Sequence, residues 1–176
     1  MRAAITAALC SCTILLSGCE SVGSVPTSKI ATALLHSTNG APAGTVLLAA
    51  AGDQVTVTVA AAGLAPGVHG LHLHTTGSCE APTFASAGGH LNPEGMQHGT
   101  ANPAGSHLGD LPNLIADSYG AGTVTARLPG SRGAVEAALF DDGGTAIVIH
   151  ADADDYQTDP SGNSGARIAC GVLKRS

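Results

Sequence analysis

The feature that most constrains this chain is an aperiodic segment, residues 80–113, which interrupts an otherwise strand-forming sequence. It is rich in Gly, Pro, Asn, Ser and His. A loop of this length is uncommon in a compact domain unless something holds it. His90, His98, His107 and Asp110 stand within it at spacings of eight, nine and three residues. Three imidazoles and a carboxylate suffice for a closed tetrahedral Zn²⁺ site that folds its own loop, and a disordered insertion is the alternative.

A second group of histidines lies on sequence that predicts strands. Residues 68–74 alternate apolar residues with His, and alternate residues of a strand point to the same face. His72 and His74 therefore project together and can bind one transition metal, although a lone His-x-His pair could equally be two surface histidines. His150 ends a separate apolar run, residues 145–150.

The remaining periodicity predicts an all-β fold. Strands are expected at 29–36, 45–50, 54–59, 68–74, 114–117, 123–128, 145–150 and 167–172, with no convincing helix. Eight short strands favour an antiparallel Greek-key sandwich or barrel carrying one long metal-binding loop. Because aromatic residues make up 2% of the chain, its core must be built from Val, Leu, Ile and Ala. The net charge of −6 and the lack of a basic cluster argue against a nucleic-acid partner.

The N-terminal segment has the features of an export signal. Residues 1–18 combine an early Arg2 with an apolar run too short to span a bilayer, which indicates a signal peptide that is removed. The run ends in Leu16-Ser17-Gly18-Cys19, which resembles a bacterial lipobox and implies a lipid on Cys19. Residues 19–28 are interpreted as a tether and 29–176 as the domain. We expect a lipid-anchored protein on the periplasmic or extracellular face of a bacterial membrane; an ordinary signal peptide, leaving Cys19 free, is the alternative.

Cysteine usage fits an oxidising compartment. Of the five cysteines, Cys10 and Cys12 leave with the signal peptide and Cys19 takes the lipid. Cys79 and Cys170 remain as one possible pair, and a disulfide between them would persist after export. Cys79 as a metal-binding thiolate is the alternative.

The motifs together resemble copper/zinc superoxide dismutase, most closely its bacterial secreted branch. The resemblance rests on His72-x-His74, residues 86–93 around His90, His98-Gly99, residues 107–111, residues 148–151 around His150, and residues 165–172. It runs from about residue 29 to the C-terminus with the motifs in order. The family's β-sandwich agrees with the predicted strands. Its disulfide falls at the positions of Cys79 and Cys170.

The resemblance implies a binuclear metal site. Copper would be bound by His72, His74, His90 and His150, and zinc by His90, His98, His107 and Asp110, so that His90 bridges both metals. Asp154 would accept hydrogen bonds from one copper and one zinc histidine, here His72 and His98, with a solvated acidic turn as the alternative. His69 matches a family histidine that supports the site without binding metal.

The resemblance also implies the activity. Superoxide would be converted to O₂ and H₂O₂ by copper that cycles between two oxidation states. In this cycle the bond between His90 and copper would break, the ring would take a proton, and the bond would then form again. Arg167 would draw in and orient the anionic substrate. The loop at residues 155–165 is short and holds no Lys or Arg, so steering should rely on Arg167 or on charges elsewhere.

Two rival functions differ in class from an enzyme. One is a copper/zinc-binding or copper-carrier domain, and the other is a membrane-anchored sandwich that uses its metals only for stability. The complete ligand set and Arg167 favour the enzyme, with a role in protecting the cell envelope from extracellular superoxide. The sequence is compatible with either a monomer or a homodimer.

Overall fold

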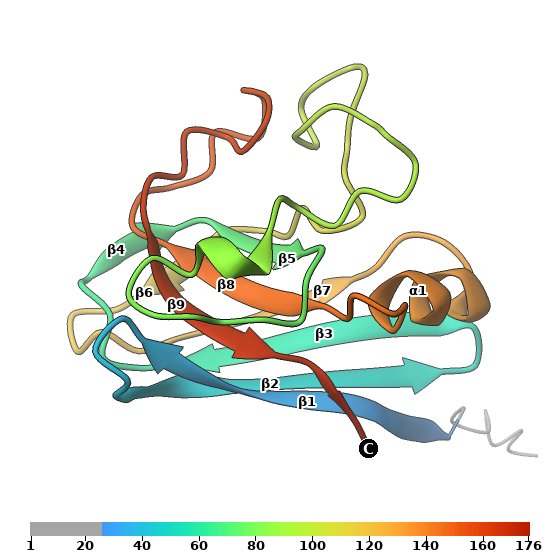
Figure 1. Cartoon of the computed structure of the whole chain (residues 1–176), viewed down its shortest axis with the longest axis horizontal. Helices are drawn as coiled ribbons and strands as arrows, with labels where there is room; N and C mark the ends of the chain where they lie inside the picture. Colours follow the sequence, from blue (N-terminus) through green and yellow to red (C-terminus); the bar gives the residue numbers. More distant parts are fainter. Residues whose placement is uncertain (1–25) are drawn as a thin grey trace, which may run out of the picture.

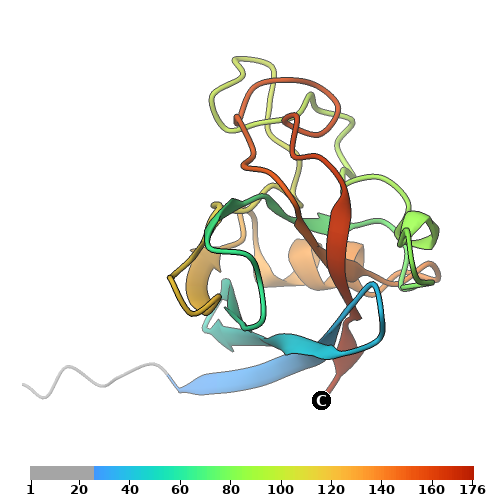
Figure 2. The same cartoon turned by 90° about the vertical axis from the view of Figure 1, so that its left-hand side faces the viewer.

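The computed structural model describes residues 26–176 (Figures 1 and 2). The predicted signal peptide (1–18) and Cys19 lie outside the described residues. Strand β1 (Thr27–Ser37) begins two residues before the expected domain boundary at 29. The last two residues assigned to the tether are therefore part of the sheet.

Strands dominate the fold, as predicted, and pair antiparallel throughout. The main sheet has the order β5-β8-β9-β1-β2-β3-β7, with β10 also paired to β1, while β4 and β6 form a separate pair. This order places the first strand of the domain between β2 and β9, and the sheet curls around the core (Figure 1). The remaining strands are β2 (Pro42–Ala51), β3 (Gln54–Ala61), β4 (Gly67–His69), β5 (Leu71–His74), β6 (Leu114–Ala116), β7 (Gly122–Arg127), β8 (Ala146–His150), β9 (Arg167–Val172) and β10 (Lys174–Arg175).

Alternation of side chains builds the core from aliphatic residues. In β3, Val55, Val57 and Val59 are buried, whereas Thr56 and Thr58 are only partly buried. Each valine buried in this way contributes roughly 1.5–3 kcal/mol relative to leaving it exposed. By contrast, β8 is buried along its whole length, because one of its faces packs on the core and the other lies beneath the loops.

The expected single strand at 68–74 is in fact two strands, separated at Gly70. β4 pairs with β6 and β5 pairs with β8. At the break, the Gly70 N–H donates to the Asp152 carbonyl at 2.8 Å instead of to a strand. A Cβ at this position would lie 2.7 Å from the Ser164 Cβ, so the loop after β8 packs directly on Gly70.

The expectation of no helix is wrong, because α1 spans Arg132–Leu139. The Ser131 side chain caps its first turn by accepting from the Ala134 N–H. Val135 and Leu139 are buried one turn apart, and Arg132 pairs with Glu136 along the exposed side. A helix of two turns offers too few repeats for its period to stand out in the sequence. No helix of the described residues is long and apolar enough to cross a membrane.

Two long connections project side by side from the same end of the sheet (Figures 1 and 2). One runs from β5 to β6 and includes the short 3-10 helix η1 (Ala85–Ala87), and the other joins β8 to β9. The predicted disulfide between Cys79 and Cys170 is present, with the two Cα atoms 5.7 Å apart. It ties the start of the first connection to β9.

Candidate metal centre

The long β5–β6 connection folds back along β5, which explains how distant histidines meet. The Leu91 N–H donates to the Leu73 carbonyl at 2.8 Å, and the Leu73 N–H donates to the Gly109 carbonyl at 2.9 Å. Leu91 is buried against the same core as Leu73. Two isolated backbone bridges continue this pairing, His74 with His90 and His72 with Asp110.

Four histidines form a buried cluster above β5 and β8. One ring nitrogen from each lies within 4.8 Å of the others, and all four residues are buried. None of these inward-facing nitrogens has a hydrogen-bond partner among the described residues. Buried polar atoms are almost always paired, so unpaired atoms that converge on one point are a metal-ligand arrangement. The atoms are His72 Nδ1, His74 Nε2, His90 Nε2 and His150 Nε2.

The opposite nitrogen of three of these rings is held in place. His74 Nδ1 lies 3.0 Å from the Gly88 carbonyl, and His150 Nδ1 lies 3.3 Å from the Gly165 carbonyl. A carbonyl can only accept, so these nitrogens carry the proton and leave the lone pair of Nε2 facing the cluster. His72 is held the same way by Asp154, which leaves its Nδ1 facing inward. Such outer contacts fix the tautomer that binds metal.

A second cluster surrounds the Asp110 carboxylate. Its Oδ1 lies 3.1 Å from Nδ1 of each of His90, His98 and His107. Ligands at 2.0–2.1 Å in a Zn²⁺ tetrahedron are separated by roughly 3.3 Å, so the spacing and the donor types fit zinc. His72 also lies within 4.8 Å of His90, His98 and Asp110, although its inward nitrogen belongs to the four-histidine cluster. His90 belongs to both clusters, with Nε2 in one and Nδ1 in the other.

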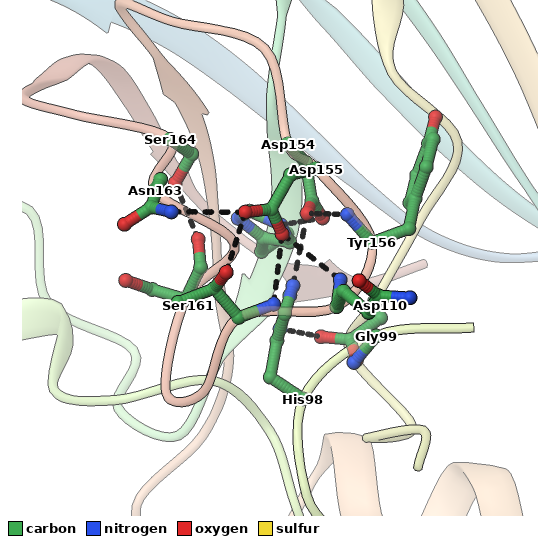
Figure 3. Close-up of polar contacts among 12 residues, drawn as sticks. His98, Gly99, Asp110, Asp154, Asp155, Tyr156, Ser161, Asn163 and Ser164 are labelled. Carbon is green, nitrogen blue, oxygen red and sulfur yellow. Dashed lines mark hydrogen bonds and ion pairs between the residues drawn. The ribbon is translucent and has the colours of Figure 1, made fainter. Parts of the chain in front are cut away.

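Asp154 joins the two clusters, and Figure 3 shows it beside His98 of the second cluster. Its Oδ2 accepts from His72 Nε2 at 2.8 Å and its Oδ1 accepts from His98 Nε2 at 2.9 Å. These are the two histidines that the resemblance assigned to it. Gly162 is required beside this carboxylate, because its φ is +63° and a Cβ there would overlap Asp154.

Burial lowers the pKa of three histidines of the four-histidine cluster, and hydrogen bonds keep the Asp110 carboxylate charged. Burial lowers the pKa of His90 to about 4, of His150 to about 3 and of His74 to about 2. Burial alone would raise the pKa of Asp110, but hydrogen bonds from His90 and the Gly99 N–H hold it well below its usual value. Neutral imidazoles and an ionised carboxylate are the protonation states that bind metal.

Arg167 lies at the edge of the four-histidine cluster. Its guanidinium donates to the carbonyls of Phe84 at 2.7 Å and Gly88 at 2.6 Å, both in the β5–β6 connection. It lines a cavity of about 460 Å³ together with His74, His90 and His150. Within the described part of the chain, Arg167 is the only lysine or arginine lining this cavity, and Asp159 is on its wall. Burial lowers the pKa of Arg167, but a guanidinium stays protonated in proteins.

His69 contacts two backbone carbonyls rather than either cluster. Its Nδ1 lies 2.8 Å from the His150 carbonyl, and its Nε2 lies 2.9 Å from the Ala65 carbonyl. Sequence reasoning missed Asn113, whose side chain both donates to the Asp154 carbonyl and accepts from the Asp154 N–H, each at 2.9 Å. Only its place three residues after Asp110 could have marked it, since an Asn carries no metal-binding signature of its own.

Comparison with known proteins identifies the family. Residues 42–173 match the family model of copper/zinc superoxide dismutase (SODC). The chain is 43% identical over 143 residues to superoxide dismutase [Cu-Zn] 2 of Aquifex aeolicus, which covers 80% of this chain and 84% of the relative.

Solved structures agree with this match. A superoxide-dismutase-like protein from Bacillus subtilis superposes with a TM-score of 0.77 at 38% identity, covering 84% of this chain and all of that one. Cu/Zn superoxide dismutase from Brucella abortus superposes with a TM-score of 0.67 at 28% identity, covering 85% and 100% of the two chains. The chain therefore belongs to the copper/zinc superoxide dismutase family.

Proposed function

We propose that this protein dismutates superoxide, with copper held by His72, His74, His90 and His150 and zinc held by His90, His98, His107 and Asp110. The observation that carries the proposal is the shared position of His90. One of its ring nitrogens faces three other unpaired histidine nitrogens, and the other faces the Asp110 carboxylate. That arrangement would let His90 serve as a ligand of both metals, one through each ring nitrogen.

When bound, copper supplies one-electron oxidation and reduction, and zinc supplies fixed charge that holds the loop. Two superoxide ions and two protons give one O₂ and one H₂O₂. Arg167 binds the incoming anion in the cavity, because it contributes a permanent positive charge beside His74 and His150. His90 Nε2 would take up and return one proton, because its Nδ1 lies beside Asp110 and Nε2 is the ring nitrogen without a partner among the described residues.

The test is metal content combined with turnover on the mature protein loaded with both metals. One copper and one zinc per chain with rapid superoxide consumption is the expected result. His90→Ala should lose turnover, and a matched replacement of the exposed His36 should not. Binding of both metals without turnover would instead indicate that the protein functions in copper carriage or storage.

We also propose that the protein acts in the bacterial cell envelope, anchored through a lipid on Cys19. The proposal rests on the apolar run that ends in Leu16-Ser17-Gly18-Cys19. Cys19→Ala should shift the protein from the membrane fraction to the soluble fraction and abolish lipid labelling. Equal membrane association of the variant and the wild type would refute the anchor.

A further inference from the structure

Tyr156, in the connection between β8 and β9, contacts three segments through three different polar atoms. Its backbone N–H donates to Asp154 Oδ1 at 2.7 Å (Figure 3). Its carbonyl accepts from the Ala101 N–H at 2.9 Å, and its hydroxyl accepts from the Asn113 N–H at 2.7 Å. The residue thus joins Asp154 to both the middle and the end of the loop that carries the Asp110 cluster.

These contacts close a ring around Asp154. The Asn113 backbone N–H donates to the Tyr156 hydroxyl, and the Asn113 side chain forms two reciprocal hydrogen bonds with the Asp154 backbone. The Tyr156 N–H shares Asp154 Oδ1 with His98 Nε2, which lies 2.9 Å away. The Asn113 side chain therefore holds the Asp154 backbone, and the Tyr156 N–H holds the Asp154 carboxylate that orients His98.

The backbones of Tyr156 and Gly99, the residue after His98, pack closely against each other. Gly99 has a φ of +99°, and a Cβ there would overlap the Tyr156 carbonyl. Gly99 also donates to Asp110 Oδ2 at 2.8 Å. Tyr156 itself has a φ of 61°, a region that a bulky side chain adopts only when its surroundings demand it.

We propose that Tyr156 is a positioning residue for the zinc cluster. Its hydroxyl holds Asn113 at the end of the loop, and its main chain holds Asp154 and Ala101, so that His98 and Asp110 are presented at zinc-binding distance before metal arrives. The inference rests on zinc binding at the Asp110 cluster, as proposed above. It assigns no chemical step to the phenol.

The chain supplies a matched pair of variants, because it has only two tyrosines. Tyr156→Phe removes the hydroxyl that accepts from Asn113. Tyr119→Phe makes the same change at a side chain that is 91% exposed. Zinc affinity of the metal-free full chain is measured by competition with a chromophoric chelator, and Co²⁺ in place of zinc reports ligand geometry through its visible absorption.

Tyr156→Phe should bind zinc about tenfold more weakly and shift the Co²⁺ spectrum, while Tyr119→Phe matches the wild type. If Tyr156 only stabilised the fold, the variant would unfold more easily without metal but keep the zinc affinity and the Co²⁺ spectrum. That result would overturn the inference. Failure of the wild type itself to bind zinc would overturn the proposed zinc ligands. This outcome differs from failure of the role proposed for Tyr156, in which the wild type and the variant bind zinc equally well.

A second measurement leaves Tyr156 intact, in case its variant does not fold. The chain has no Trp, so Tyr119→Phe leaves Tyr156 as its only tyrosine fluorophore. Because the proposal has Tyr156 in place before metal arrives, adding one equivalent of Zn²⁺, which has no redox chemistry, to this metal-free variant should leave the emission nearly unchanged. A large change in Tyr156 emission with the first equivalent would show that Tyr156 takes its place only after zinc binds, and would overturn the proposal.

Discussion

Replacement of Asp154 by Asn tests whether one carboxylate orients both metal clusters. The two oxygens of Asp154 accept from His72 and His98, and Oδ1 also accepts from the Tyr156 N–H. Asn keeps the shape but turns one acceptor into a donor, which would face the N–H of a histidine. One of these two rings must then turn or lose its partner.

The size of the effect follows from the position of this contact. Loss of an outer-shell partner of a metal-binding histidine typically costs 10–100-fold in metal affinity. That range corresponds to about 1.4–2.7 kcal/mol. Asp154 Oδ1 contacts His98 on the proposed zinc side, and Oδ2 contacts His72 on the proposed copper side. We therefore expect Asp154→Asn to weaken binding of the metal on the side that loses its acceptor by roughly this amount.

The assay is competition of the metal-free protein with chromophoric chelators for zinc and for copper in separate titrations. Asp152→Asn, two residues away with an exposed side chain, is the matched control and should bind both metals like the wild type. Circular dichroism establishes that both variants are folded. Wild-type affinity for both metals in folded Asp154→Asn would refute the reasoning that this carboxylate orients the ligands.

Three further predictions concern rate, crosslinking and pH. Arg167→Ala should lower the rate of superoxide consumption about tenfold or more and remove most of the salt dependence of that rate. Replacing the exposed Arg127 by Ala is the control and should change neither quantity. Equal salt dependence in Arg167→Ala and the wild type would exclude steering by Arg167. Replacing both Cys79 and Cys170 by Ser should lower the free energy of unfolding by up to about 4–5 kcal/mol in urea denaturation, because the bond closes a separation of 91 residues, and an unchanged midpoint would contradict this. In the metal-free protein the free energy of unfolding should fall as the pH drops from about 6.5 towards 4, since the unfolded chain takes up protons that the folded chain does not. Each histidine with a lowered pKa contributes at most about 1.4 kcal/mol per pH unit. A flat profile from urea midpoints would contradict the lowered pKa values of His74, His90 and His150.

Much of the sheet could be predicted from the sequence, because the two-residue period of a strand is a local property. The valines of β3 alternate in the sequence as they alternate in burial. The strand break at Gly70 could not be predicted, since it depends on a loop that arrives more than 80 residues later to contact this glycine. Helix α1 was missed because its two buried residues, Val135 and Leu139, make a pattern too short to distinguish from a turn.

The sequence by itself determined which chemistry the protein can perform. The sequence gives the residue types of the candidate ligands and of Arg167 directly. A nitrogen or carboxylate ligand keeps its metal preference in any fold, so these residue types indicate the chemistry. Their order along the sequence was enough to suggest the family before any geometry was known.

Only the tertiary structure decided how those groups are held. The contact between Asp154 and His98 spans 56 residues and that between Tyr156 and Asn113 spans 43, and neither pair has a local signature. Tautomers, the shared position of His90 and the closed ring around Asp154 arise from packing two loops on the end of one sheet. Hydrogen bonds are directional and short, so they are specified only when the whole chain has brought donor and acceptor together.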